Sequence, residues 1–197
     1  MIRSLLQHRG RSVGIERAAS AAGMDYRSED GHGLSKVAFQ HMARGDGRGW
    51  TASHVVTHTS RDGAKIHAFD VRSWTEYAHQ GATRSAAMAP LPITAPQLVI
   101  GRENVVSKLF ATATRIDLDV ESEMFNRSYH VIGQDRAFAR ELLDAQMIDL
   151  MVSTEGKITF EFLGRWLLLH TEQVAPDSMP GLARLADEMR QVVPALV

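Results

Sequence analysis

Residues 115–143 read RIDLDVESEMFNRSYHVIGQDRAFARELL, and the stretch that decides the fold continues to Val152. Apolar and acidic residues alternate from Arg115 to Glu121, which is the period-two pattern of a strand with one buried face. The apolar face consists of Ile116, Leu118 and Val120, and the acidic face consists of Asp117, Asp119 and Glu121. The sequence therefore predicts a strand with one core face and one solvated acidic face.

The second half of this stretch predicts a corner, another strand, a cap and a helix. The alternation breaks at residues 122–124, as at a tight corner between antiparallel strands. It resumes in Phe125, Arg127, Tyr129 and Val131. Gly133 ends the predicted strand, and Asp135 stands where a carboxylate would cap a helix. That helix, with a bend near Ala145, has an apolar stripe formed by Phe138, Leu142, Leu143, Met147, Ile148 and Met151.

The run EMFNRSYHV at residues 123–131, followed by this helix pattern, resembles the strand signature E-F-N-R-x-[FY]-x-V. That signature is typical of an uncharacterised actinobacterial family of small, usually membrane-anchored proteins. Further similarity lies in residues 15–26, 69–71 and 91–100, so the resemblance covers most of the chain from about residue 15. The resemblance implies no known activity. The hydrophobic anchor of the relatives has no counterpart in the sequence. Because the sequence has neither an apolar run near the roughly 18 residues of a membrane span nor a signal-peptide core, we expect a soluble, cytoplasmic protein.

Composition limits the possible functions. The 197 residues, 44% of them hydrophobic, predict an N-terminal arm, residues 1–13, and one domain, residues 14–197. The net charge of −1 argues against a nucleic-acid partner. The absence of cysteine excludes disulfides, cysteine-bound zinc and a cysteine nucleophile. Only four of the 22 basic residues are Lys, a bias that suits an actinobacterial genome or a phage of such a host.

A hairpin is predicted over residues 50–74 around a two-residue Asp62-Gly63 turn. This turn places Val56 opposite Phe69, and His58 opposite His67. His58 and His67 are weak candidates for a metal site, because two imidazoles without further ligands do not complete one. We therefore expect neither a bound metal nor a cofactor.

The remaining elements complete the predicted fold. We expect a crossover over residues 77–88, an edge strand at residues 97–100 after three closely spaced prolines, and a second hairpin around Gly164. Ser178 is expected to cap an amphipathic C-terminal helix. Together these elements predict an α+β fold in which N-terminal, central and C-terminal helices pack on one face of an antiparallel sheet.

The sequence contains no recognisable catalytic constellation, so we expect a non-enzymatic binding or adaptor domain that contacts a protein partner or itself. Partner contact is expected at the family-like polar residues, on the acidic strand face and at the uncovered sheet edge. These residues are Asn126, Arg127, Tyr129, Asp117, Asp119, Glu121 and Val99. Two alternatives are a carrier of a small apolar ligand, held between the sheet and the C-terminal helix, and a hydrolase without a recognisable motif. Residues 1–13 offer a further alternative, contact with a membrane surface.

Overall fold

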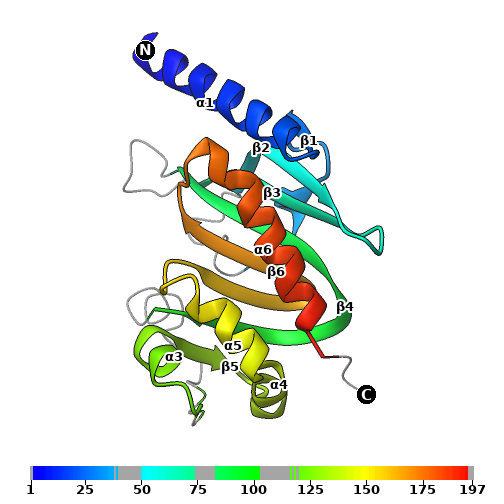
Figure 1. Ribbon diagram of the computed structural model, residues 1–197, viewed down its shortest axis with the longest axis vertical. Coiled ribbons are helices and arrows are strands. Elements are labelled where there is room, and N and C mark those ends of the chain that lie inside the picture. Colours follow the sequence, from blue (N-terminus) through cyan, green and yellow to red (C-terminus); the bar gives the residue numbers. More distant parts are fainter. Residues whose placement is uncertain are drawn as a thin grey trace.

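The computed structural model describes residues 2–37, 39, 50–73, 83–102, 116, 118 and 120–194. Its described part is an α+β fold, as predicted, with a six-stranded antiparallel sheet and helices packed around it (Figure 1). The strands are β1 (Asp25–Glu29), β2 (Trp50–Thr59), β3 (Lys65–Ser73), β4 (Thr83–Gly101), β5 (His130–Gly133) and β6 (Thr159–Glu172). The helices are α1 (Ile2–Ala21), α3 (Glu123–Ser128), α4 (Arg136–Leu142), α5 (Ala145–Val152) and α6 (Met179–Val192), with short 3₁₀ turns at Leu34–Lys36 and Pro176–Ser178.

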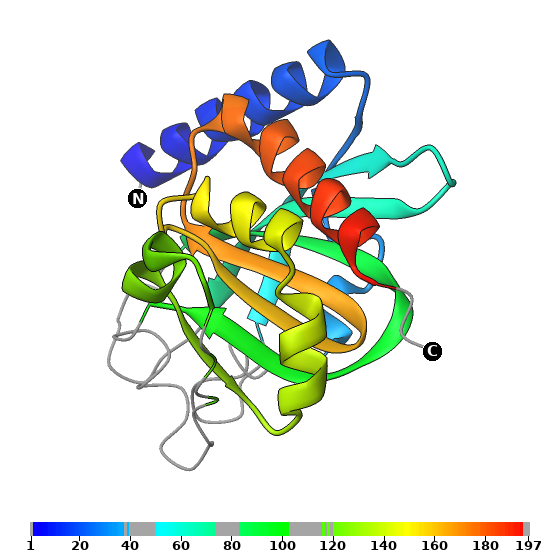
Figure 2. The same cartoon turned by 60° about the horizontal axis from the view of Figure 1, so that its bottom comes forward.

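The sheet is organised by β4, which pairs with β3, β5 and β6. β4 and β6 bend back together, so that each contributes to both ends of the sheet (Figure 2). Pro90 pairs with Trp166 and Ala95 pairs with Gly164, so four residues of β4 match a single residue of β6. This difference in path length places β4 around the outside of the bend. The predicted hairpin around Gly164 is therefore wrong, because residues 159–172 form one bent strand.

The predicted edge at residues 97–100 is also wrong. Val99 is fully buried, with Ile132 of β5 on one side and Glu161 of β6 on the other. The prolines interrupt pairing only near the bend, and the chain after them returns to the middle of the sheet. Residues 83–88 of the predicted crossover belong to β4, while residues 77–82 lie outside the described residues.

The β2–β3 hairpin forms as predicted, but its register is shifted by one residue. The loop contains three residues, Arg61 to Gly63, because Ser60 N donates to Ala64 O and Gly63 adopts a φ of +85°. Val56 therefore lies opposite Ala68 instead of Phe69. A bulge between Ser53 and Val56 then changes which face the strand residues occupy, since a slip of one residue turns side chains to the opposite face.

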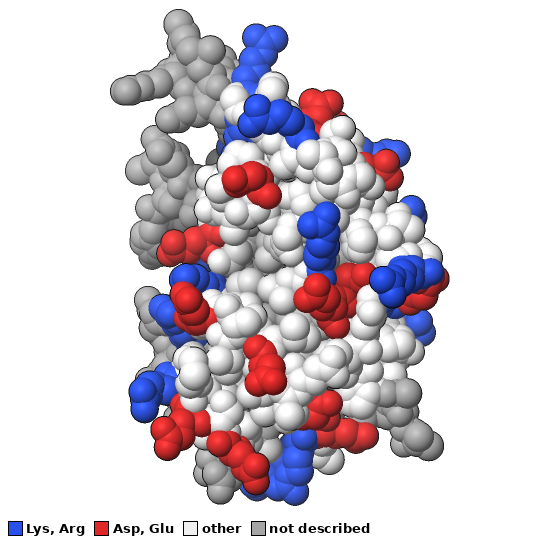
Figure 3. Space-filling model, viewed as in Figure 1, with Lys and Arg blue, Asp and Glu red and all other residues white. Residues whose placement is uncertain are grey.

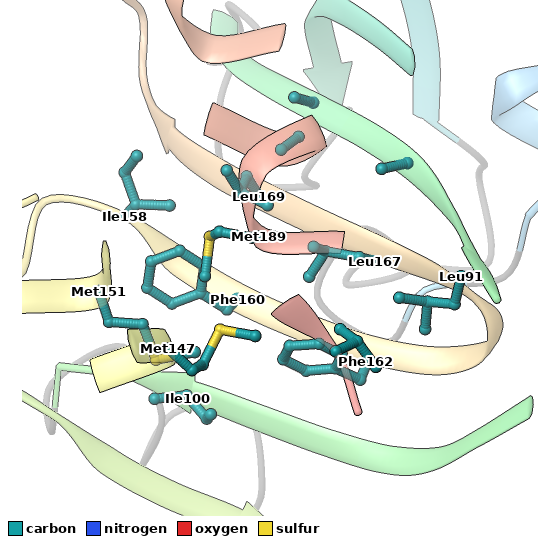
Figure 4. Close-up of a cluster of buried hydrophobic side chains, with 14 of the residues drawn as sticks. Leu91, Ile100, Met147, Met151, Ile158, Phe160, Phe162, Leu167, Leu169 and Met189 are labelled. Carbon is teal, nitrogen blue, oxygen red and sulfur yellow. The ribbon is translucent and has the colours of Figure 1, made fainter. Parts of the chain in front are cut away.

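Apolar side chains are buried on both faces of the sheet. The larger cluster joins β4 and β6 to α1, α4, α5 and α6, and Figure 4 shows its centre, where Phe160, Met189 and Met147 meet. The smaller cluster lies on the other face and includes Trp50 and Phe69, whose rings stack 5.7 Å apart. The long helices share one cluster, which agrees with the predicted packing of helices on one face.

Helix α1 runs without interruption from Ile2 to Ala21, so the described part of the predicted arm and the predicted helix from Ile15 form one element. It ends before Gly23, whose φ of +69° suits the turn out of the helix. Arg11 fixes α1 to the sheet with bonds of 2.6 and 2.7 Å to the carboxylate of Asp70. The orientation of α1 thus depends on a charged pair as well as on apolar packing.

The central stretch differs from its prediction at α3 and in the described residues just before it. Residues 123–128 form helix α3 instead of a strand, and only His130–Gly133 is a strand. The cause is local, because Ser122 accepts a hydrogen bond from Phe125 N at 3.2 Å and caps the helix. Helical spacing then brings Phe125 and Tyr129 together, with ring centroids 5.3 Å apart. In the part of the predicted first strand that the structure describes, residues 116, 118, 120 and 121, no residue is in a regular strand, although Ile116 N donates to Val131 O.

Candidate binding site

A groove of about 500 Å³ lies between the segment before α3 and the helix pair α4–α5. Asn126 holds the first wall in place, because its side-chain amide donates to Val120 O at 2.7 Å. The second wall is set by two carboxylate caps. Asp135 accepts from Phe138 N at 2.9 Å and starts α4, whereas Asp144 accepts from Met147 N at 2.8 Å and starts α5. These local bonds hold each wall of the groove in shape.

The groove has an apolar floor and a charged rim. The floor and rim are formed by Leu118, Val120, Glu121, Ser122, Arg136, Arg140, Leu143, Ala145, Ile148 and Asp149. Arg136 and Arg140 are one turn apart on α4, and both are exposed. Within the described part of the chain, neither guanidinium takes part in an ion pair or a side-chain hydrogen bond. Both positive charges are therefore available to a partner.

The candidate residues taken from the central stretch have different roles. Tyr129 is only 3% exposed, donates to Met151 O at 2.9 Å and accepts from Gly156 N at 3.2 Å. Its burial raises the pKa of the phenol above its ordinary value, so the hydroxyl stays protonated and fixes α3 against α5. Arg127 is exposed and lies 3.9 Å from Glu123, a pair on the surface of α3. Of these residues, Asn126 alone shapes the groove directly.

The acidic candidates are only partly placed by the structure. Glu121 is exposed and lines the groove, whereas Asp117 and Asp119 lie outside the described residues. The carboxylate of Asp149 lines the same groove from α5. The rim therefore carries both signs of charge. Figure 3 shows the same mixture over the face that carries α5 and α6, where neither sign forms a continuous patch.

His58 and His67 do not form a shared site. The corrected register pairs His58 with Ile66 and His67 with Thr57, so the two imidazoles project from opposite faces of the sheet. His58 Nε2 lies 3.2 Å from Asp187 Oδ2 of α6, while the ring of His67 lies against that of His32, with centroids 4.3 Å apart and the planes tilted by 31°. Burial lowers the pKa of His67 to about 4. In the described ranges, no three potential ligands are arranged to hold a metal ion.

The expected cavity between the sheet and the C-terminal helix is replaced by packed side chains. Ala183, Ala186 and Met189 of α6 are fully buried in the larger cluster together with Leu167 and Leu169 of β6. Figure 4 shows Met189 directed toward β6. A ligand of the carrier hypothesis would therefore need another site, and the groove beside α4 and α5 is one candidate.

Sequence reasoning missed Arg136, Arg140, Ala145 and Asp149 as groove residues. The signal for the two arginines was present, because a spacing of four places them on one side of a short helix. No sequence pattern indicates that residues 118 and 120–122 lie beside that helix. The groove is a product of tertiary structure.

No protein-family model matches the chain, and no curated protein matches it significantly. A solved structure has a similar fold, the crystal structure of the mycobacterial trehalose monomycolate transport factor A, TtfA. The two chains superimpose with a TM-score of 0.62 at 15% sequence identity, and the match covers 96% of this chain and 99% of the other. The similarity shows a shared fold. Within the described residues, no helix combines the length and the apolar character needed to cross a membrane.

Proposed function

We propose that the protein is a non-enzymatic binding domain that holds a short segment of a protein partner in the groove between residues 118–122 and α4–α5. The observation that carries this proposal is the apolar floor of the groove beside two guanidinium groups without ion pairs among the described residues. Its volume of about 500 Å³ falls within the range of roughly 300–1,000 Å³ that is usual for ligand sites. An apolar centre with a charged rim is also the usual anatomy of a protein interface.

The chemistry of the rim indicates the kind of segment that fits. Ile148 and Leu143 present apolar surface to a partner side chain, and Arg136 and Arg140 present N–H donors suited to a carboxylate. The partner segment should therefore carry an apolar residue with an acidic residue close to it. Glu121 and Asp149 on the same rim disfavour a segment with acidic residues throughout, since like charges repel.

The fold comparison supports a binding role, because the protein of similar fold is named a transport factor and the name describes no catalysis. We also propose kinship with the actinobacterial family that the EMFNRSYHV run resembles. In this chain that run forms α3 and positions the first wall of the groove through Asn126. A family signature at this place would preserve the shape of the binding site.

Selection of binders from a displayed random-peptide library tests the proposal even though the natural partner is unidentified. The groove is blocked by Ala145→Trp, since Ala145 is exposed at the start of α5 and lines the groove. The matched control is Ala137→Trp, since Ala137 is exposed on α4 and does not line it. We expect selected peptides with an apolar and an acidic residue, whose affinity falls at least about tenfold in Ala145→Trp and stays unchanged in Ala137→Trp.

Two further measurements separate the alternatives. The double variant Arg136→Glu with Arg140→Glu should lower the affinity for the same peptides, because its carboxylates repel their acidic residue. Arg127→Glu on α3 should leave the affinity unchanged. Native mass spectrometry of the purified protein tests the carrier hypothesis. A carrier would retain a small apolar molecule, seen as added mass, and the Ala145→Trp variant would lose it. Peptides that bind equally well to both tryptophan variants would refute the groove as the partner site.

A further inference from the structure

A second hollow lies at the open end of the bent β4–β6 pair. Because both strands bend back, the first and last residues of each converge on one side of the molecule, at the left of Figure 1. Arg84 stands near the start of β4 and Arg102 directly after its end, while Thr159 opens β6 and Glu172 closes it. These residues line a pocket of about 420 Å³. It is separate from the groove, with which it shares no lining residue.

The charges in this pocket are not balanced by one another. Arg84 has no ion pair among the described residues, and Arg102 Nη2 donates to the uncharged carbonyl of Glu155 at 2.9 Å. Lys157 is neutralised by the carboxylate of Glu155. Glu172 is the opposing charge, and it lies opposite Arg84 in the strand register without forming an ion pair with it. Two guanidinium groups against one carboxylate leave an excess positive charge.

Arg102 is held in place by the turn after α5. A side chain at Gly156 would place its Cβ 2.9 Å from Arg102 Nε, so the missing side chain makes room for the guanidinium. Gly156 also has a φ of +69°, which other residues rarely adopt. The carbonyl of Glu155 fixes one nitrogen of the same group. Because this hydrogen bond already restrains the guanidinium, less rotamer freedom is lost when an anion binds.

A buried hydroxyl provides independent evidence for a ligand site. Thr159 lines the pocket and is only 7% exposed, yet its hydroxyl has no hydrogen-bond partner among the described residues. Buried polar groups are nearly always hydrogen-bonded in folded proteins. A hydroxyl can donate to an anionic oxygen, so a bound anion would satisfy it.

We propose that this pocket binds a phosphate group. Arg84 and Arg102 stand at the two ends of β4 and Thr159 at the start of β6, and all three line the pocket. A phosphate group has more acceptor oxygens than a carboxylate, so it can accept from all three donors at once. The volume exceeds that of a bare ion, so the group is carried by a larger molecule, either a soluble phosphate ester or the headgroup of a phospholipid.

NMR titration of the whole chain with glycerol 3-phosphate tests the proposal. We expect saturable shifts of the Gly156 and Thr159 amides, and at least about a tenfold weaker affinity in the variant Arg84→Gln with Arg102→Gln. Arg102→Lys should also weaken binding, because it keeps the charge and loses the planar pair of donors. The control is Arg165→Gln, an exposed arginine of β6 at the closed end of the bend, which should bind as the wild type does.

A second arm identifies the source of the phosphate. Flotation with phosphatidylglycerol vesicles, compared with phosphatidylcholine vesicles, reports binding to an anionic headgroup. If the protein binds glycerol 3-phosphate but does not float with the vesicles, the ligand is a soluble metabolite. If it floats with phosphatidylglycerol vesicles and the double variant does not, the ligand is a lipid headgroup. Either result supports a phosphate site. If neither ligand binds, or if binding is equal in the double variant and the Arg165→Gln control, the proposal is wrong.

Discussion

Helix α6 and the pair α4–α5 cover neighbouring parts of the same sheet, but they are attached in different ways. Helix α6 is fixed by both apolar packing and a charged cluster. Arg190 donates to Pro90 O at 3.0 Å, to Asp187 Oδ1 at 3.2 Å and to Asp62 Oδ2 at 2.5 Å, and thereby joins the helix, the bend of β4 and the β2–β3 loop. In α4, by contrast, Arg136 and Arg140 form no ion pair within the described residues.

This difference separates surfaces that stabilise the fold from surfaces free to bind. Charged groups that already pair with neighbours in the fold add little binding energy when a partner arrives. Exposed, unpaired charged groups beside an apolar surface add more. The α6 side should therefore respond to substitution with loss of stability. The groove beside α4 and α5 should respond with loss of binding.

The largest expected effect lies in the core shared by both regions. Phe160 of β6 is fully buried, and Figure 4 places it between α5 and α6. Phe160→Ala should lower the free energy of unfolding by about 3–5 kcal/mol, because it removes buried apolar surface and leaves a cavity. Urea denaturation measures the change. Met124→Ala, at a residue 64% exposed, is the control and should stay within about 0.5 kcal/mol of wild type. A small loss in Phe160→Ala would mean that the two regions do not share a core.

The next effect concerns the charged cluster of α6. Arg190→Met keeps most of the apolar stem and removes the guanidinium that neutralises the buried Asp187 and pairs with Asp62. We expect a loss of about 2–3 kcal/mol at pH 7, which is less than the roughly 3–5 kcal/mol of a fully buried pair because Asp62 is half exposed. Arg136→Met on α4 provides the comparison, and its loss should not exceed about 0.5 kcal/mol.

The pH dependence of the same variant gives a second test. The hydrogen bond from Arg190, the largest cause, lowers the pKa of Asp62 to about 2. Burial opposes ionisation of Asp187, but hydrogen bonds from Gln191, Ser60, Arg190 and His58 outweigh it and lower the pKa of that carboxyl as well. A lowered carboxyl pKa stabilises the fold above the unfolded value near 4 and ceases to do so as the pH falls through the folded value. The stability difference between wild type and Arg190→Met should therefore shrink from pH 4 toward pH 2, and a constant difference would contradict it.

The same comparison shows where sequence reasoning succeeds and fails. The cap at Asp135 and the apolar stripe of α6 were predictable, because both depend on residues a few positions apart. The strand prediction for residues 125–128 failed where an alternating pattern competed with the Ser122 cap. The prediction that Val99 lies at a sheet edge failed for another reason, since no local pattern distinguishes a central extended segment from an edge strand. The groove joins segments from different parts of the chain, so its residues could be predicted singly but not as a site.

The smallest expected effect decides whether the groove is a binding surface. Ala145→Trp adds a large side chain at an exposed position whose backbone lies in the first turn of α5, where the Asp144 cap remains intact. Because the new ring enters the groove and not the core, the free energy of unfolding should stay within about 0.5 kcal/mol of wild type, as in Ala137→Trp. Urea denaturation of both variants measures this. A substantially larger loss in Ala145→Trp alone would show that the groove is part of the packed interior, and α4–α5 would then resemble α6 in being a stabilising surface.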